Sequence, residues 1–397
     1  MKQGWEIKKL GEVCTFQRGL TYSKDDEVEH SNNCVLRSNN IDLDTMSIVL
    51  DELKYINDDF AVSEDKKVKP NTILICMSNG SKQHIGKVAF IDKEYGYAFG
   101  GFMGLIRPNA EVSPKFIYYS CISSSYKHFL AGIGNGANIT NLKFSDLQQY
   151  TLPIPPREEQ ERIVEELDCL SGVIERKREQ LNELDALAQS IFYQMFGDPI
   201  TNEKGWETRP LKNSVIEMFL GPFGSALKTD CYVSKEDAYC MVYEQKHAIK
   251  KTMELETHYI DKDKFESLKR FEVHSGDFIM SCRGTIGEIY RLPNNAPIGI
   301  IHPSLMKIRI KEDVYHPTFF IRLLTHIVKN ENTNGNCVQM AITAKELGAR
   351  TPITPPLTLQ QQFAEKIGRI EKQKQLIKES IDEMENLFNS RMDYYFN

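Results

Sequence analysis

Residues 155–196 read PPREEQERIVEELDCLSGVIERKREQLNELDALAQSIFYQMF, and they decide the architecture expected for this chain. Apolar residues recur here at alternating steps of four and three, the heptad pattern of helices that pair as a coiled coil. Proline is favoured in the first turn of a helix, because the amide hydrogen that it lacks would be unpaired there. Residues 355–396, PPLTLQQQFAEKIGRIEKQKQLIKESIDEMENLFNSRMDYYF, repeat the pattern. The sequence therefore predicts two long helices that pair with each other.

The predicted seam consists of side chains from both helices. They are Ile163, Leu167, Leu170, Ile174, Leu181, Leu184 and Ile191 in the first helix and Phe363, Ile367, Ile370, Ile377, Ile381, Met384 and Phe388 in the second. Lys177 and Lys374 interrupt the seams, and a polar residue at such a position commonly fixes the register of a coiled coil. Leu187, Phe192 and Phe196 fall outside the first seam, so we expect them to form apolar surface for a partner protein.

The segments before the two helices are also duplicated. Gly4-Trp5-Glu6 recurs as Gly205-Trp206-Glu207, and His84-Ile-Gly-Lys-Val88 is matched by Thr285-Ile-Gly-Glu-Ile289. Self-similarity at a long, fixed period indicates a repeated architecture. Each half has about 150 residues of short strands, turns and a few helices before its long helix, a size typical of one domain. We predict an α+β fold with two mixed α/β domains in tandem.

Composition places the chain among ordinary globular proteins, since 41% of its 397 residues are hydrophobic and 26% are charged. It has no run of about 18 apolar residues and no apolar stretch at its N-terminus, so we expect a cytoplasmic protein without a membrane partner. Its nine cysteines are scattered without the spacing of zinc ligands, and we expect reduced thiols and no bound metal.

The net charge of -6 lies in the long helices. Residues 157–196 carry 5 Lys and Arg against 10 Asp and Glu, residues 357–396 carry 6 against 7, and the rest of the chain balances at 38 against 38. Binding to DNA phosphates requires clustered basic residues. The globular halves can concentrate positive charge on one face, so the negative total does not exclude a nucleic-acid partner.

Catalytic motifs are missing from the sequence. There is no dinucleotide-binding Gly-x-Gly-x-x-Gly, no His-Glu-x-x-His and no Gly-x-Ser-x-Gly. Glu52-Leu-Lys54, downstream of Asp42 and Asp44, has the residue types of a metal-dependent nuclease, but the second half has no equivalent. We expect no catalytic residue and no cofactor in this chain, with an autonomous nuclease at Glu52 and Lys54 as an alternative.

The order of the duplicated motifs resembles the specificity (S) subunit of type I restriction-modification enzymes, and the resemblance covers essentially the whole chain. Its marks are Gly4-Trp5 and Gly205-Trp206, Gly221-Pro-Phe-Gly-Ser225, Tyr243-Glu-Gln-Lys-His247, and the domain ends Leu152-Pro-Ile-Pro-Pro156-Arg-Glu-Glu-Gln160 and Thr351-Pro-Ile-Thr-Pro-Pro356-Leu-Thr-Leu-Gln360. The first half departs from the pattern, with Gln17-Arg-Gly-Leu-Thr21 where the second has the fuller Gly-Pro-Phe-Gly-Ser. This divergence is in keeping with two domains that read different sequences.

The resemblance implies a non-catalytic subunit that reads DNA. It implies target recognition domains at residues 1–153 and 198–353 and conserved helical spacers at residues 154–197 and 354–397, related by an internal pseudo-two-fold repeat. Each domain would contact one half of a bipartite, asymmetric site in double-stranded DNA. The helices would pair as an antiparallel coiled coil and set the spacing between the half-sites.

The resemblance also implies an assembly. Two modification subunits, which bind S-adenosylmethionine and flip the target adenine, would dock on this chain. Restriction subunits would add ATP-driven translocation and nuclease activity, so S-adenosylmethionine, ATP and Mg²⁺ are expected in the partner subunits.

Candidate DNA-binding residues are the polar clusters beside matched turns. Asn and Gln can bond adenine bidentately, Arg and Lys can bond guanine, and Ser, Thr and backbone groups mostly contact phosphates. The candidates are Arg37, Ser38, Asn39, Asn40, Ser78, Asn79, Lys82 and His84 in the first half and Ser225, Lys228, Glu244, Gln245, Lys246, His247, Arg283 and Thr285 in the second.

Two further alternatives remain open. One is the specificity chain of a type IIB-like enzyme, whose partner fuses methylation and cleavage in one polypeptide; the neighbouring genes distinguish it from type I. The other is a coiled-coil DNA-binding scaffold, which is expected to show no sequence-specific footprint with any methyltransferase.

Overall fold

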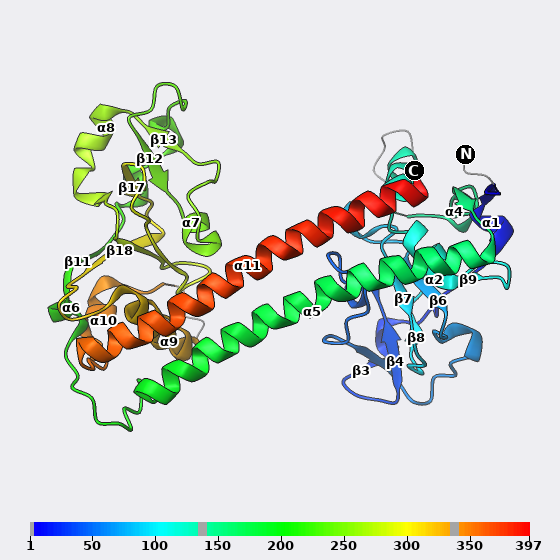
Figure 1. Ribbon diagram of the computed structural model, residues 1–397, viewed down its shortest axis with the longest axis horizontal. Helices are drawn as coiled ribbons and strands as arrows, with labels where there is room; N and C mark the ends of the chain where they lie inside the picture. Colours follow the sequence, from blue (N-terminus) through cyan, green and yellow to red (C-terminus); the bar gives the residue numbers. More distant parts are fainter. Residues whose placement is uncertain (1–3, 134–140, 334–340) are drawn as a thin grey trace. The chain divides into compact units, whose positions relative to one another are not determined.

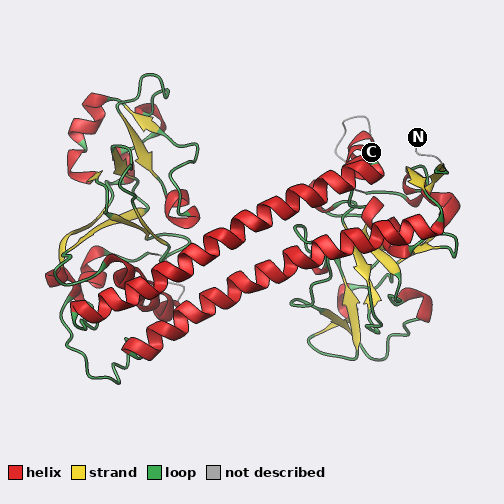
Figure 2. Ribbon diagram, viewed as in Figure 1, coloured by secondary structure: helices red, strands yellow, loops and turns green. Residues whose placement is uncertain are grey.

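The computed structural model describes residues 4–133, 141–333 and 341–397, and it divides into two compact units (Figure 1). Unit 1 comprises residues 1–179 and 378–397, and unit 2 comprises residues 180–377. Each unit therefore combines one globular part of the chain with a portion of both long helices. Both units mix helices with β-sheets, as Figure 2 shows, which confirms the predicted fold class.

Unit 1 contains two four-stranded sheets, with strands in the orders β2-β9-β6-β7 and β3-β5-β4-β8. The first sheet is antiparallel, while β4 and β8 in the second are parallel. The strands of the first sheet are β2 (Cys14–Arg18), β9 (Met103–Pro108), β6 (Thr72–Cys76) and β7 (Val88–Ile91). Those of the second are β3 (Glu27–Val28), β5 (Lys54–Ile56), β4 (Asn33–Leu36) and β8 (Ala98–Phe99).

Unit 2 repeats this plan, with strand orders β11-β18-β15-β16 and β13-β12-β17-β14. Its first sheet is also antiparallel, and β12 and β17 form the parallel pair that corresponds to β4 and β8. The strands of the first sheet are β11 (Val215–Leu220), β18 (Leu305–Ile310), β15 (Phe278–Ser281) and β16 (Ile289–Arg291). Those of the second are β13 (Tyr259–Ile260), β12 (Cys240–Tyr243), β17 (Gly299–Ile301) and β14 (Glu272–Val273).

Shorter elements complete the globular parts. In unit 1, β1 (Glu6–Lys9) pairs with β10 (Thr151–Ile154), and the short helices are α1 (Leu10–Val13), α2 (Pro114–Ser120), α3 (Ser124–Gly132) and α4 (Phe144–Leu147). In unit 2 they are α6 (Leu211–Ser214), α7 (Gln245–Lys250), α8 (Lys262–Ser267), α9 (Pro317–Thr333) and α10 (Ala344–Ala349).

The two long helices are α5 (Arg157–Phe196) and α11 (Leu357–Phe396), each of 40 residues. Both begin directly after a Pro-Pro pair, as the sequence predicts. The first helical glutamine fixes each start in the same way. The side-chain oxygen of Gln160 accepts the backbone amide of Ser113 at 2.7 Å, and that of Gln360 accepts the amide of His316 at 2.8 Å. Both glutamines are buried, so these bonds attach each helix to its domain.

Within each unit the two helices run antiparallel. In unit 1, Arg178 pairs with Glu385 at 2.7 Å, and Glu166 accepts from Arg391 at 2.8 Å, so residue numbers fall along one helix as they rise along the other. In unit 2, Lys374 Nζ lies 2.8 Å from Asp185. All fourteen predicted seam residues are buried or half-buried. Lys374 thus makes a specific interhelical contact, which is the role expected of a polar seam residue.

Two residues outside the seam correct a prediction. The sequence predicts apolar surface at Phe192 and Phe196, but these side chains are only 1% and 0% exposed. Their rings pack against Phe319 of α9, with centroids 5.7 and 4.6 Å away. The same two rings also contact Phe363 of α11, with centroids 5.7 and 5.4 Å away. The heptad alone does not describe this contact, because the C-terminal part of α5 packs against both α9 and α11 in unit 2. Leu187 remains 48% exposed, as predicted.

Each unit has its largest core where a sheet, a domain helix and the long helices meet. In unit 1 this core contains Ile75 of β6, Phe116 of α2, Leu167 of α5 and Phe396 of α11. The core of unit 2 uses the corresponding elements β15, α9, α5 and α11. A second cluster of buried residues in each unit includes side chains from both of its sheets.

No helix in residues 4–133, 141–333 and 341–397 is both long and apolar enough to cross a membrane. The eight cysteines in these ranges are free thiols, and Cys337 lies outside them.

Candidate nucleic-acid interface

In unit 1 the structure brings both predicted polar clusters together. The first cluster follows β4 and the second follows β6. The side-chain amide of Asn79 donates to Ser38 Oγ at 2.8 Å, although the two residues are 41 positions apart. The segment before β9 joins them, because the backbone amides of Met77 and Ser78 donate to the carbonyl of Phe102 at 2.9 and 3.1 Å. Three loops therefore meet at one edge of the sheets.

Unit 2 has the corresponding cluster with different side chains. The side-chain amide of Gln245, which follows β12, donates to the carbonyl of Arg283, which follows β15, at 2.8 Å. The segment before β18 again joins the loops, because the amide of Cys282 donates to the carbonyl of Ser304 at 2.9 Å. The position of the cluster is thus duplicated while its residues differ.

Most of the sixteen candidate residues are accessible in these loops. Asn39, Lys82, Ser225, Lys228, Arg283 and Thr285 are exposed, and Arg37, Ser38, Ser78, Asn79, His84, Glu244, Gln245 and Lys246 are half-buried. Arg37 Nε and His84 Nδ1 are covered atoms without a hydrogen-bond partner among the residues described. Burial, assisted by the nearby Lys87 charge, lowers the pKa of His84. Its imidazole is therefore neutral at pH 7 and able to accept or donate a hydrogen bond.

Asn40 and His247 differ from the other candidates, because both side chains are buried and hydrogen-bonded within their own loops. Asn40 is 1% exposed; its oxygen accepts the amide of Arg37 at 2.9 Å, and its nitrogen donates to two backbone carbonyls. His247 is 0% exposed, and its Nδ1 accepts the amide of Glu244 at 2.8 Å. Burial lowers the pKa of His247, which keeps it neutral. Both side chains stabilise the first turn of a short helix, so they cannot reach a base.

Glu244 organises its loop through three side-chain partners. Its carboxylate lies 2.8 Å from both Lys246 Nζ and His258 Nδ1, and it accepts the hydroxyl of Thr257 at 3.0 Å. Burial by itself raises the pKa of Glu244, but these hydrogen bonds outweigh it and hold the pKa below its ordinary value. The carboxylate is therefore ionised and engaged, which suits positioning of Lys246 better than direct contact with a base.

Sequence reasoning missed residues that the fold adds to these loops. Arg18 donates from Nε to the carbonyl of Gly101 at 3.3 Å, next to the first cluster. His258 stacks on Tyr232 with ring centroids 4.1 Å apart and completes the Glu244 network. His302 donates its backbone amide to Tyr243 beside the second cluster. His258 and His302 lie outside the matched segments, and Arg18 lies in the segment Gln17-Arg-Gly-Leu-Thr21, where the first half departs from the second. Only the folded chain brings these three residues to the site.

The residues of the nuclease alternative are not assembled. Lys54 Nζ lies 2.6 Å from Glu27, while the carbonyl of Glu52 accepts from Asn39. The carboxylate of Asp42 accepts the backbone amide and hydroxyl of Thr45, which lower its pKa. In the parts of the chain that the structure describes, no group of three or more His, Cys, Asp or Glu residues could hold a metal ion.

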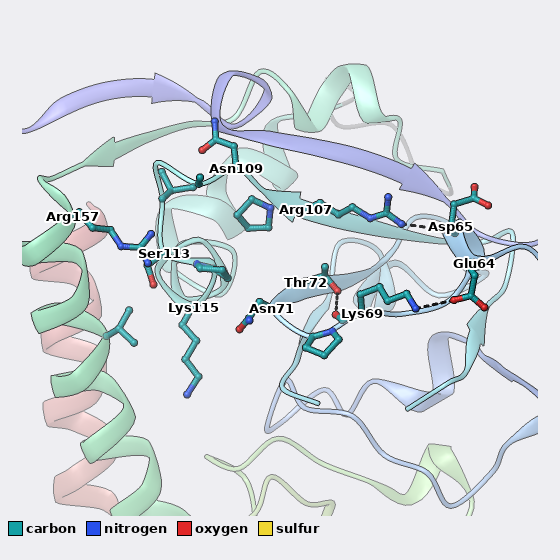
Figure 3. Close-up of a pocket in the computed structure, with 16 residues that line it drawn as sticks. Glu64, Asp65, Lys69, Asn71, Thr72, Arg107, Asn109, Ser113, Lys115 and Arg157 are labelled. Atoms are coloured by element: carbon teal, nitrogen blue, oxygen red, sulfur yellow. Dashed lines mark hydrogen bonds and ion pairs between the residues drawn. The ribbon is translucent and has the colours of Figure 1, made fainter. Parts of the chain in front are cut away.

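Unit 1 also has an open hollow of about 960 Å³, lined by residues from the start of β6, the loop after β9 and the start of α5 (Figure 3). Four cationic side chains line it: Lys69, Arg107, Lys115 and Arg157. Each already has a partner. Lys69, Lys115 and Arg157 form ion pairs of 2.6 to 2.9 Å with Glu64, Asp168 and Glu161, and Arg107 donates to the carbonyl of Asp65. We therefore assign no anionic ligand to this hollow.

The sequence is similar to that of known proteins along most of its length. The family model described as type I restriction modification DNA specificity domain matches residues 2–186. The EcoKI specificity subunit of Escherichia coli K12 is 23% identical, with 93% of this chain and 82% of that protein covered. The putative MjaX specificity subunit of Methanocaldococcus jannaschii is also 23% identical, with 93% and 87% covered.

Solved structures share the fold. A chain from a study of complex assembly and conformational transition of the type I R-M system has a TM-score of 0.59 at 17% identity, covering 99% of this chain and 97% of that one. The S subunit of a type I restriction-modification system from M. genitalium has a TM-score of 0.54 at 13% identity, covering 99% and 96%. These similarities extend across both units.

Proposed function

Since this chain belongs to the family of specificity subunits of type I restriction-modification enzymes, we propose that it selects the DNA sequence on which such an enzyme acts. Residues 1–153 and 198–353 are the two target recognition domains, each contacting one half of a bipartite, asymmetric site. The observation that carries the proposal is the duplicated loop cluster, built around Asn79 and Ser38 in one unit and Gln245 and Arg283 in the other. Equivalent positions with different side chains suit two half-sites of different sequence.

Thirteen of the candidate residues remain as proposed DNA contacts, since Asn40 and His247 have structural roles and Glu244 positions Lys246. Arg283 and Lys82 carry the groups best suited to base edges in the major groove. Ser225, Lys228 and Thr285 are exposed and suited to phosphate oxygens. The globular halves carry balanced charge, so their loops are free to attract DNA. The long helices are acidic and repel DNA.

The helical spacers, residues 154–197 and 354–397, set the distance between the two half-sites. The antiparallel contacts within each unit support this proposal, because a paired helix resists bending and slipping. Spacing therefore depends on helix length, while sequence preference depends on the loop clusters.

The spacers also dock two modification subunits. Leu187 is 48% exposed and Leu387, at the corresponding position of the second helix, is 41% exposed, so both repeats present an apolar side chain at the same place. The modification subunits supply S-adenosylmethionine, and restriction subunits supply ATP-driven translocation, Mg²⁺ and cleavage. The named relatives are all type I subunits, which favours this assembly over a type IIB-like partner.

This chain itself performs no catalytic step. The pairing of Lys54 with Glu27 supports this proposal, because it engages the lysine that the nuclease alternative requires. A subunit with this role works in the compartment that holds the DNA, in agreement with the cytoplasmic location expected from the sequence.

The proposal is tested by selecting DNA from a random library with the purified chain bound to its modification subunits. We expect enrichment of one motif with two unlike halves separated by a fixed gap. The chain alone with Mg²⁺ is expected to leave the same DNA uncut. Enrichment of a continuous motif, or of none, would contradict the proposal, and cleavage that Glu52→Ala abolishes would restore the nuclease alternative.

A further inference from the structure

Each unit presents one phenylalanine almost fully to solvent at its loop cluster. Phe102 in unit 1 is 72% exposed, and Phe223 in unit 2 is 87% exposed, more than any other large hydrophobic side chain described. An aromatic ring held outside the core buries little area within its own chain, so its large apolar face is available to a binding partner.

The backbone around Phe102 is fixed from several sides. Its carbonyl accepts the amides of Met77 and Ser78, and the next residue, Met103, donates to Gly100 at 2.8 Å. A Cβ atom on Gly19 would lie 2.1 Å from the carbonyl oxygen of Gly100, so only glycine permits this approach of the two segments. The ring therefore projects from a well-anchored turn.

Phe223 is anchored in a comparable way. The amide of Gly221 donates to Leu305 at 2.9 Å, and a Cβ atom on Gly221 would lie 2.3 Å from the carbonyl oxygen of His302. On its other side, the carbonyl of Phe223 accepts the amide of Ala226 at 2.8 Å and begins the 3₁₀ helix η5 (Gly224–Ala226). Pro222 between these anchors is buried and restricts the backbone further.

The two phenylalanines occupy the same edge of corresponding sheets but come from different strands. Gly19 donates to Met103 in unit 1 just as Gly221 donates to Leu305 in unit 2, so these pairs are equivalent. In unit 1 the phenylalanine is next to the acceptor residue of this pair, because Phe102 directly precedes Met103. In unit 2 it is near the donor residue, because Phe223 follows Gly221. The ring is thus present in both repeats although the sequence that supplies it is not repeated.

The surroundings of the rings are polar and cationic. Arg18 donates to Gly101, and Arg37 lies beside Gly100, next to Phe102. Ser225 and Lys228 follow Phe223 on the same loop and are exposed. Aromatic rings bordered by basic and hydroxyl side chains are suited to nucleic acid, in which bases stack on the ring and phosphates meet the cations.

We propose that Phe102 and Phe223 are DNA wedges, each inserting its ring against a base step of its own half-site and partly unstacking it. This inference rests on the proposed function and adds a contact that reads stacking and deformability instead of hydrogen-bond pattern. Unstacking a step beside the target lowers the cost of extruding a base for methylation. Because each ring serves one domain, loss of either affects one half-site.

The test uses the complex of this chain with its modification subunits and duplexes of the selected site that carry 2-aminopurine at successive steps of each half-site. We expect binding to raise the fluorescence at one step in each half. Phe102→Ala is expected to abolish the rise in one half-site and Phe223→Ala in the other, each with about ten- to hundredfold weaker binding, the range that loss of one base–aromatic stack produces. Phe102→Leu, which keeps an apolar wedge, is expected to restore most of the rise.

Unaltered fluorescence and affinity in both alanine variants would overturn the wedge. A second outcome would also overturn it. If the alanine variants bind the modification subunits less tightly in sedimentation without DNA, and the complex that still forms shows unaltered fluorescence, the rings contact protein and not DNA. Failure of the proposed function is distinct from both outcomes, since the unsubstituted complex would then select no bipartite site. Both rings are exposed, so these substitutions are expected to leave thermal unfolding unchanged.

Discussion

Lengthening both long helices by one heptad is expected to widen the gap in the recognition sequence by about three base pairs and to leave both half-site sequences unchanged. Seven helical residues add about 10 Å, and successive base pairs rise about 3.4 Å. Repeating residues 173–179 after Glu179 and residues 371–377 after Ile377 places both insertions at the boundaries between the compact units. Each unit then keeps its own interhelical contacts, including Arg178 with Glu385 and Lys374 with Asp185. Seven residues also preserve the seam to within about 20° of rotation.

The readout is the motif bound by the variant complex, obtained by selection from a random library. The matched control carries the insertion in α5 alone, which shifts the helices out of register and is expected to abolish selection. An unchanged gap in a variant that still selects DNA, or a gap change accompanied by new half-site sequences, would disprove the spacer role.

Arg283→Ala is expected to relax or abolish recognition of one half-site only. The side chain of Arg283 is exposed, while its backbone is held by Gln245 and by a bridge to Ala341. Loss of a bidentate arginine contact to guanine costs about 1–3 kcal/mol, which corresponds to roughly five- to 150-fold weaker discrimination at one base pair. The measurement is the affinity of the complex for duplexes with each base pair substituted in turn.

Lys82→Ala provides the matched control, because Lys82 is an exposed cation in the corresponding loop of unit 1. It is expected to affect the other half-site and to leave the one read by Arg283 intact. A uniform loss across both half-sites in Arg283→Ala, or no loss, contradicts the assignment.

The repeat and the long helices were predictable from sequence because heptad periodicity is local and strong. The spacers predicted at residues 154–197 and 354–397 contain helices at Arg157–Phe196 and Leu357–Phe396. The burial of Phe192 and Phe196 was not predictable, because a heptad identifies one face of a helix and gives no information about α9. The parallel pairing of β4 with β8 was also inaccessible, since it joins segments more than 60 residues apart.

The candidate site was predictable in position but not in the role of each residue. Polar clusters beside matched turns identified the loops that Asn79 and Gln245 join. Polarity alone could not separate a helix-capping residue such as Asn40 from an exposed one such as Asn39, because both are asparagines in one short run. Phe102 and Phe223 were not predicted as ligand contacts, since an apolar residue in a sequence is ordinarily assigned to the core.

The most direct test of the central claim is single-molecule methylome sequencing of cells that carry the native gene cluster, with and without an in-frame deletion of this gene. We expect one gapped, asymmetric motif to lose N6-methyladenine on both strands in the deletion, and we expect restoration of the gene to restore the mark. An unchanged methylome, with the cluster expressed, would contradict the role of this chain as the subunit that selects the DNA sequence.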